Sequence, residues 1–368
     1  DGLTTAFQRL WLDPAVARGV LSYLAATQAS AYDPERDAEP GKIVHEVRTG
    51  EMAALGEIPF GRYYGSVDTT PLFVALAGAY HRRTADRETI DGSWPNIERA
   101  LEWIDKDGER YCYCGGEDAR RTARGLASQG WKDSADSISH ADGKLAEGPI
   151  ALVEVQGYVY AAFRAAASLL RVRGDEGRAR KYDERAEKLR VEFDRVFWSP
   201  ELGTYHLALD GAKRPCAVRA SNAGHALFTG IALRERARRV CNALMRAHSF
   251  SGWGVRTLDD REARYNPMSY HNGSVWPHDN AVAALGMARY GLKREALDVL
   301  DASYRAHLHF EMHRMPELFC GFVRQSDDGP TPYPVACAPQ SWAAGAIFML
   351  LQAVIGIDVD APRKRIRI

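Results

Sequence analysis

The fold is decided by residues 150–172, IALVEVQGYVYAAFRAAASLLRV, and by residues 176–197, EGRARKYDERAEKLRVEFDRVF. The first segment is apolar nearly all round, which indicates a helix buried on most sides. The second is rich in Arg, Lys and Glu and keeps one apolar stripe that includes Tyr182, Leu189 and Phe193, which indicates an outer, half-exposed helix. The pair therefore predicts a helical hairpin with one inner and one outer member.

The same order of a buried helix and an amphipathic one recurs at a period of roughly 50–60 residues. Residues 277–290 are apolar, 293–307 are amphipathic, and 341–355 are apolar again. Further helices are predicted after Asp13-Pro14, over Leu72–Tyr80 and from Trp94-Pro95-Asn96-Ile97 onward. We therefore expect an all-α fold in which stacked hairpins form a closed ring.

The connections between these helices are long and carry many aromatic and ionisable residues, which is typical of functional loops. A closed ring would direct such loops into one central pocket. Strand patterns are few. Residues 203–209, GTYHLAL, before Asp210-Gly211 predict one strand of a hairpin.

The bulk composition excludes several classes of protein. The 368 residues contain 48 Lys and Arg and 48 Asp and Glu, so the formal net charge of zero does not favour binding to nucleic acid or to an anionic membrane. Length alone allows two domains. No run of about 18 apolar residues predicts a membrane span, and the first residues lack the pattern of a signal peptide.

Six cysteines have spacings that fit no zinc site, so we expect unpaired thiols in a reducing compartment and a cytoplasmic protein. They are Cys112, Cys114, Cys216, Cys241, Cys320 and Cys337.

The stretch with the clearest chemistry is 129–137, QGWKDSADS. It places Asp133 and Asp136 beside Trp131, between a glycine and small polar residues. Unpaired burial of an Asp charge is costly, so packing alone explains this segment poorly. An indole beside two acids suits a site that stacks on a sugar ring and transfers protons. The structural alternative is an exposed turn held by Asx hydrogen bonds.

Two further loops precede helices. In the first, 61–71, Asp68 either caps the following helix or binds sugar hydroxyls together with Arg62 and the neighbouring tyrosines. In the second, 219–225, Ser221 or Asn222 is a candidate helix cap and His225 a candidate ligand-binding residue.

The loop at 265–280, YNPMSYHNGSVWPHDN, concentrates histidines, aromatic residues and asparagines as binding surfaces do. In the loop at 313–322, HRMPELFCGF, Glu317 lies between apolar residues. It is either a buried ion pair with Arg314 or Arg324 or a carboxylate whose pKa is tuned for proton transfer.

The chain carries no strong cofactor or metal signal. His225, His271, His278 and His313 could converge, but no pair has the spacing of metal ligands on one helix face. Neither a phosphate-binding glycine loop nor a Gly-x-Ser-x-Gly elbow is present. We therefore predict no cofactor and no metal.

Taken in order, WKDS, YHNGSVWP, PELF and APQSW at 338–342 resemble the catalytic domain of bacterial glycogen-debranching-type enzymes, the amylo-α-1,6-glucosidases. These belong to the wider group of (α/α)6-barrel glycosidases, which includes glucoamylases, trehalases and processing α-glucosidases. The resemblance covers nearly all of residues 1–368. It implies a single catalytic domain with an (α/α)6 barrel and short strands in its loops.

The resemblance also implies roles for individual residues. Asp133 would be the general acid and Glu317 the general base of an inverting hydrolysis. Asp1 would be the sugar-binding acid of the family's Gly-Arg-Asp segment, without its Arg. The family's N-terminal β-rich domain and first barrel helix would be absent, which leaves about eleven barrel helices by the count of apolar periods.

Asp136 is the alternative acid, or else a like charge that raises the pKa of Asp133. The remaining candidates for contacts with the sugar are Arg62, Asp68, Trp131, His225, His271, Asn272 and Trp276.

The expected activity is hydrolysis of α-glucosidic bonds, above all the α-1,6 branch stubs of glycogen-like oligosaccharides. The expected partner is an oligosaccharide or α-glucoside substrate, without nucleic acid or membrane. A different α-glycoside (trehalose, glucosylglycerate or mannosylglycerate) is the alternative within this class. Outside it, a sugar epimerase that depends on histidines and a non-catalytic carbohydrate-binding helical domain remain open.

Overall fold

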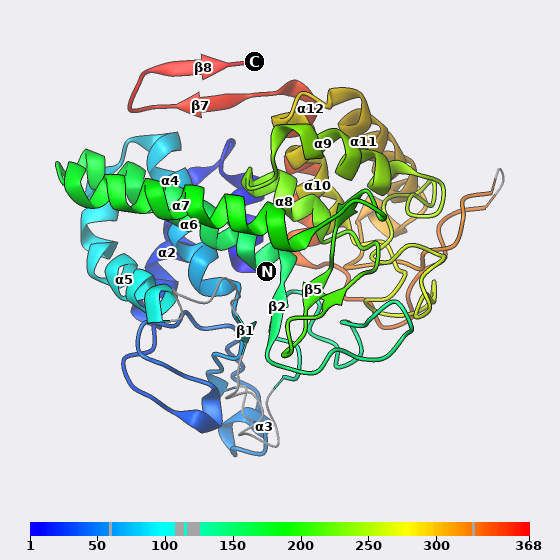
Figure 1. Ribbon diagram of the computed structural model, residues 1–368, viewed down its shortest axis with the longest axis horizontal. Coiled ribbons are helices and arrows are strands. Elements are labelled where there is room, and N and C mark those ends of the chain that lie inside the picture. The colour runs from blue at the N-terminus through cyan, green and yellow to red at the C-terminus, as the bar shows by residue number, and fades with distance from the viewer. Residues whose placement is uncertain (59–60, 107–113, 116–125, 326–327) are drawn as a thin grey trace.

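A computed structural model describes residues 1–58, 61–106, 114–115, 126–325 and 328–368 of the chain. Helices dominate it and form two layers (Figure 1). The inner layer consists of α1 (Gly2–Arg9), α4 (Thr69–Thr84), α6 (Val153–Val172), α8 (Ala223–Thr229), α10 (Pro277–Arg289) and α12 (Ser341–Ile355). The outer layer consists of α2 (Pro14–Ala26), α5 (Arg87–Lys106), α7 (Glu176–Phe197), α9 (Arg234–Met245) and α11 (Lys293–His307).

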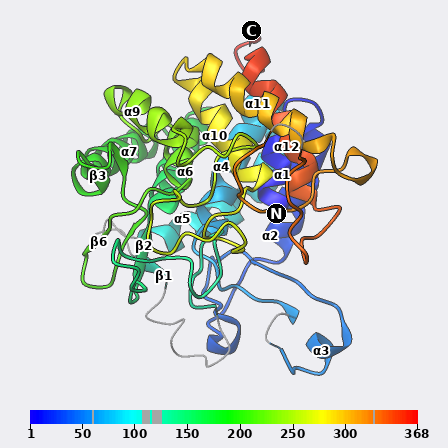
Figure 2. The same cartoon turned by 90° about the vertical axis from the view of Figure 1, so that its right-hand side faces the viewer.

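The inner helices close into a ring. Each packs against the next along the chain, and α12 packs against α1. The outer helices cover this ring, and α7 and α9 lie at its periphery (Figure 2). The described residues thus hold six inner and five outer helices, which confirms the (α/α)6 architecture and the expected count of eleven.

The difference between the layers follows from the sequence patterns. In α6, residues on all sides are buried, whereas α7 buries a single stripe that includes Ala179, Tyr182 and Phe193. The predicted bounds of α7, α11 and α12 agree with the structure, and Asp13 caps α2 by accepting from the backbone N–H of Ala15 at 3.1 Å.

Close contact between inner helices depends on small residues. A Cβ atom added to Gly286 in α10 would lie 2.5 Å from the backbone nitrogen of Phe228 next to it in α8. One added to Gly345 in α12 would lie 2.0 Å from Gln8 Oε1 in α1. A side chain at either position would force its neighbour to shift.

The predicted start of α5 is wrong. The helix begins at Arg87, and Pro95 lies inside it. Ile90, Trp94 and Ile97 form one continuous buried stripe across the proline. Pro95 has no N–H to donate to the carbonyl of Asp91. Asp91 and Pro95 are both exposed, so water can satisfy that carbonyl.

Strands are short and lie in the loops. One antiparallel sheet has the order β1 (Cys114–Gly115), β2 (Ile150–Leu152), β5 (Ala208–Leu209) and β6 (Pro215–Cys216). β3 (Trp198–Ser199) pairs with β4 (Thr204–Tyr205), and β7 (Asp358–Asp360) with β8 (Arg365–Arg367). The predicted strand at 203–209 is therefore divided between two sheets, because His206 donates its N–H to Phe197 and Leu207 donates its own to Cys216.

The two ends of the barrel differ. The long loops, the first sheet and the short helix α3 (Glu51–Ala54) gather at one end, and the β7–β8 hairpin lies at the other (Figure 1). Two short 3₁₀ turns, Pro34–Arg36 and Glu311–His313, also lie in loops.

No described helix is long and apolar enough to cross a membrane. Cys216, Cys241 and Cys320 are buried free thiols and Cys337 is an exposed one. Cys112 and the side chain of Cys114 lie outside the described residues.

Candidate active site

A cavity of about 820 Å³ opens among the loops at one end of the inner ring. Eight of the predicted site residues line it: Asp1, Asp68, Trp131, Asp133, His225, His271, Trp276 and Glu317. Three others do not belong to its lining: Arg62, Asp136 and Asn272. The structure therefore brings together residues from loops spread over more than three hundred positions of the chain.

Asp133 has the environment of a proton donor. Burial of its carboxyl group, together with the charges of Asp68, Glu46 and Glu317, raises its pKa to about 6. At pH 7 a carboxyl group with this pKa is protonated in roughly one molecule in ten, far more often than an ordinary Asp, as general acid catalysis requires.

Glu317 is held as an acceptor. Tyr270 Oη donates to its Oε1 at 2.8 Å, and the backbone N–H of Cys337 donates to its Oε2 at 3.2 Å. No described contact pairs it with Arg314 or Arg324, so the ion-pair alternative is wrong. Burial and the charges of both Glu317 and Asp133 raise the pKa of Tyr270, so this phenol lies near both carboxyl groups.

A short ladder of backbone hydrogen bonds positions Glu317. Phe319 and Val275 exchange backbone bonds of 2.9 and 3.1 Å, and Val275 also pairs with Arg256. This ladder sets the segment with Glu317 beside the one with Trp276.

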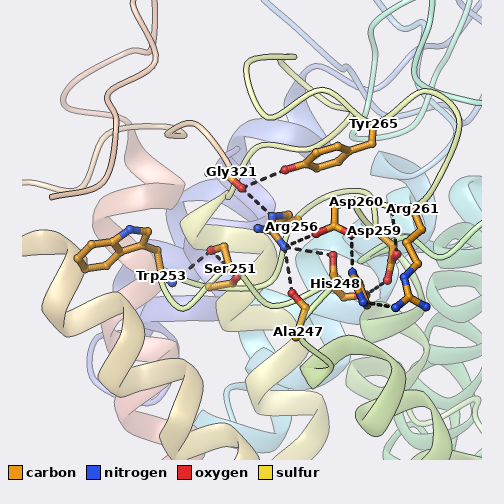
Figure 3. Close-up of polar contacts among 12 residues, drawn as sticks. Ala247, His248, Ser251, Trp253, Arg256, Asp259, Asp260, Arg261, Tyr265 and Gly321 are labelled. Atoms are coloured by element: carbon orange, nitrogen blue, oxygen red, sulfur yellow. Dashed lines mark hydrogen bonds and ion pairs between the residues drawn. The ribbon is translucent and has the colours of Figure 1, made fainter. Parts of the chain in front are cut away.

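The guanidinium group of Arg256 anchors the far end of that segment (Figure 3). Its Nε donates to the carbonyl of Gly321 at 2.6 Å, and Tyr265 Oη donates to the same carbonyl at 3.2 Å. The carbonyls of Ala247 and His248 also accept from Arg256. The arginine side chain is fully buried, and these contacts, with an ion pair to Asp260 at 3.6 Å, offset part of its desolvation.

Trp131 forms a rigid wall of the cavity. Its ring stacks on His225 with centroids 6.0 Å apart and meets the edges of His278 and Trp276 at 4.9 and 5.6 Å. His278 in turn stacks on Trp342 at 3.7 Å. These contacts fix the orientation of the Trp131 indole at the cavity lining.

Asp68 does not cap α4. It occupies the N-cap position, but its side chain makes no capping bond and accepts from Ser66 Oγ at 2.7 Å. Its carboxylate therefore faces the cavity rather than the helix.

The interpretation of Asp136 needs correction. Its carboxylate accepts from Arg264 and from Asn272 Nδ2, both at 3.2 Å, and it stands outside the cavity lining. The charges that raise the pKa of Asp133 come from Asp68, Glu46 and Glu317 instead. Asp136 and Asn272 thus brace the loop, and the exposed Arg62 lies away from the site.

The histidines of the site are buried. Burial and the charge of Lys132 lower the pKa of His271 to about 3, and Ser134 Oγ lies 2.7 Å from its Nδ1. The two ring nitrogens of His225 contact Tyr158 and Asp279. Among the described residues, no group of three His, Cys, Asp or Glu is placed to hold a metal ion.

Sequence reasoning did not assign roles to Tyr158, Tyr270, Lys132 or Arg256. Lys132 is buried directly before Asp133, and its Nζ donates to the carbonyl of Thr257 at 2.7 Å. Burial lowers its pKa to about 8, although the charges of Asp279 and Glu154 oppose the change. Its position within the Trp131–Asp133 stretch was the one available signal.

The barrel and its paired acids define a six-hairpin glycoside hydrolase. A sequence model of the mannosylglycerate hydrolase MGH1-like glycoside hydrolase domain matches residues 3–319. The chain belongs to this family. The expectation of a six-hairpin glycosidase is thus confirmed, whereas the narrower glycogen-debranching assignment is not supported.

Two curated relatives from Selaginella moellendorffii, mannosylglycerate hydrolases MGH1 and MGH2, are each 32% identical to this chain over 132 residues. That alignment covers 35% of this chain and only 26% of each relative. The chain therefore spans about a quarter of the curated relatives that it matches.

Solved structures share the fold. An uncharacterized conserved protein from Thermus thermophilus has a TM-score of 0.66 at 17% identity, covering 95% of this chain and 91% of that one. A GH63 mannosylglycerate hydrolase from the same organism, in complex with Tris, also has a TM-score of 0.66, at 16% identity, covering 95% and 92%.

Proposed function

We propose that this glycoside hydrolase is an inverting α-glycosidase with Asp133 as general acid and Glu317 as general base. The observation that carries the proposal is the pairing of two differently held carboxyl groups in one cavity. Asp133 has a pKa raised to about 6, and Glu317 is hydrogen-bonded at both oxygens by a phenol and a backbone N–H. Such a division of roles is what acid–base hydrolysis needs.

In the proposed reaction, protonated Asp133 gives its proton to the glycosidic oxygen as the bond to the anomeric carbon breaks. Glu317 accepts a proton from the water that attacks this carbon from the opposite face. Tyr270 and the N–H of Cys337 orient Glu317 for that step. Trp131, Trp276, Asp68 and Asp1 would hold the sugar ring and its hydroxyls, since all four line the cavity.

We infer that the substrate is an α-glycoside of glycerate, mannosylglycerate first and glucosylglycerate second. The family and both curated relatives carry the name mannosylglycerate hydrolase, which supports this choice over α-1,6-linked glucans and trehalose. Arg48 is the one arginine or lysine among the described lining residues, where it pairs with Glu46. It would attract the carboxylate of a glycerate leaving group.

The test is a panel of mannosylglycerate, glucosylglycerate, isomaltose and trehalose, assayed for the released sugar. We expect the glycosylglycerates to have the highest kcat/KM; faster hydrolysis of isomaltose would restore the α-1,6-glucan assignment. Asp133→Asn and Glu317→Gln should each lower kcat by about two orders of magnitude or more with the fold intact. Near-normal turnover in either variant would refute its role.

The stereochemical course of hydrolysis is tested by a separate measurement. NMR spectra recorded in the first minutes of hydrolysis should show the β-anomer of the released sugar, because inversion at an α-glycoside produces it. The α-anomer as first product would rule out the inverting assignment while leaving the two residues in place.

A further inference from the structure

A chain of hydrogen bonds links three neighbouring inner helices beneath the cavity. Tyr158 Oη in α6 lies 2.5 Å from His225 Nδ1 in α8, and His225 Nε2 lies 2.7 Å from Asp279 Oδ1 in α10. The exposed fractions of Tyr158, His225 and Asp279 are 5%, 2% and 1%. Tyr158 and His225 line the cavity, whereas Asp279 lies behind them.

The charge on Asp279 fixes the protons along this chain. Burial opposes ionisation of Asp279, but the hydrogen bond from His225 and the charge of Lys132 outweigh it and lower its pKa. An ionised carboxylate only accepts, so Nε2 of His225 carries its proton toward Asp279. In the tautomer with the proton on Nε2, Nδ1 is an acceptor.

The hydroxyl proton of Tyr158 is therefore used in the hydrogen bond to His225. A phenol has one proton, and at 2.5 Å this proton points to His225 Nδ1. What the Tyr158 oxygen can offer to the cavity is therefore an acceptor lone pair. His225 has no ring nitrogen left to contact a ligand, so its predicted role in binding sugar directly is replaced by orientation of Tyr158.

Asp68 is a second hydrogen-bond acceptor in the cavity lining. Desolvation and the charges of Glu154, Asp68 and Asp279 raise the pKa of Tyr158, so Asp68 lies close to the phenol. Asp68 lines the same cavity and already accepts from Ser66. The cavity lining thus includes two acceptors, Tyr158 and Asp68.

We propose that Tyr158 is a specificity-determining residue that accepts a hydrogen bond from one hydroxyl of the bound glycosyl unit, and that Asp279 and His225 are the positioning residues that impose this polarity. The inference rests on the proposed function, because it assigns the ligand as a sugar. It predicts that the wall selects a hydroxyl that donates and rejects substituents that cannot.

Fluorine-substituted sugars test this polarity, since a C–F group accepts weakly and never donates. Binding to the wild-type protein is measured by titration calorimetry with mannose, glucose and their deoxy and deoxyfluoro forms at C2, C3, C4 and C6. At one position, the deoxy and the fluoro sugar should both bind about tenfold or more weakly than the parent, because the buried acceptor loses its only donor.

Tyr158→Phe removes the acceptor and keeps the ring. The parent sugar should then bind no better than its deoxy form at that one position, with the other positions unchanged. Tyr160→Phe, two residues along the same helix and outside the cavity lining, is the matched control and should retain the wild-type pattern. A wild-type pattern in Tyr158→Phe would overturn the proposal.

Asp279→Asn tests the positioning residues. An amide can donate to His225 Nε2, which moves the imidazole proton to Nδ1 and turns the phenol proton toward the cavity. The fluoro sugar should then bind better than the deoxy sugar at the selected position. If the fluoro sugar still binds as weakly as the deoxy sugar to a folded Asp279→Asn variant, the role of Asp279 is refuted. If the variant does not fold, the result for Tyr158→Phe decides the proposal.

The calorimetric readout separates the two hypotheses. A protein that binds these sugars with the predicted pattern but hydrolyses no α-glycoside would contradict the proposed function alone. A protein that hydrolyses glycosylglycerates but shows no position with the predicted loss would contradict this inference alone.

Discussion

Asp133 combines a catalytic requirement with a cost to folding. Its carboxyl group is largely withdrawn from water and surrounded by Asp68, Glu46 and Glu317, which together disfavour its charge. The difference between about 6 and the ordinary value of 3.8 is equivalent to roughly 3 kcal/mol. The same environment that keeps the proton available therefore destabilises the folded protein once that proton is lost.

A pH-dependent gain in stability should follow from Asp133→Asn. The raised pKa means that the folded state binds a proton between about pH 4 and 6 that the unfolded state has released, so wild-type stability falls through this window as pH rises. Urea unfolding at pH 8 should show the variant more stable by up to roughly 3 kcal/mol. The difference should vanish near pH 4, and a pH-independent difference would contradict the assigned pKa.

The pH–rate profile of the wild type depends on the same group. The kcat/KM should decline as pH rises through about 6, because the fraction of protonated Asp133 falls. Measurement of kcat/KM from pH 4 to 8 tests this, and a plateau that extends to pH 8 would exclude Asp133 as the acid.

At the scale of elements, the segment 317–321 shows how loops without regular structure become rigid. Its ends are held by Tyr270 and Cys337 at Glu317 and by Arg256 and Tyr265 at Gly321. A Cβ atom on Gly321 would lie 1.7 Å from the carbonyl oxygen of Gly273, so the two segments are in backbone contact.

Gly321→Ala should therefore shift Glu317 away from its partners. We expect kcat to fall by about an order of magnitude or more, since small displacements of catalytic groups are costly, with a loss of stability of about 1–3 kcal/mol. Gly92→Ala is the matched control: its Cβ meets nothing within 4 Å on helix α5, and the change should raise stability slightly. Normal kcat in Gly321→Ala would show that this contact does not position the base.

Helix α5 illustrates a limit of local rules. Pro95 predicts a helix start, but the apolar stripe of Ile90, Trp94 and Ile97 continues through it. Burial of that stripe against α2 and α4 outweighs one lost backbone hydrogen bond at the exposed Asp91. By contrast, α7, α11 and α12 matched their predicted bounds because apolar periodicity and turn residues agreed there.

At the scale of the whole molecule, the closed inner ring is what converts separate loops into one site. One continuous cluster of buried apolar residues runs through the six inner helices and joins the ends of the chain through α1 and α12. The ring is therefore expected to unfold as a unit.

Gly286→Ala tests this dependence. The added methyl group would press α10 against the backbone of α8 at Phe228, and overpacking of this kind costs about 1–3 kcal/mol. Thermal unfolding followed by circular dichroism should show one transition at a lower temperature than in the Gly92→Ala control. A second, separate transition would indicate that the ring does not unfold cooperatively.

The sequence by itself determined the helical periodicity, the alternation of inner and outer helices and the loops that carry Asp133 and Glu317. These features are local, because periodicity and the cost of burying a charge can be judged from a few neighbouring residues. Only the tertiary structure decided which loop residues face the cavity. The structure places Asp136 and Asn272 outside the cavity lining. It also shows that Asp68 lines the cavity instead of capping α4.

The structure also supplied partners that sequence patterns do not mark. Tyr158 and Asp279 belong to buried helices, where they resemble ordinary packing positions, and Arg256 lies in an unremarkable loop. Their roles arise from contacts across 54 to 67 positions of the chain, since a hydrogen bond depends on the distance between atoms and not on their separation in sequence.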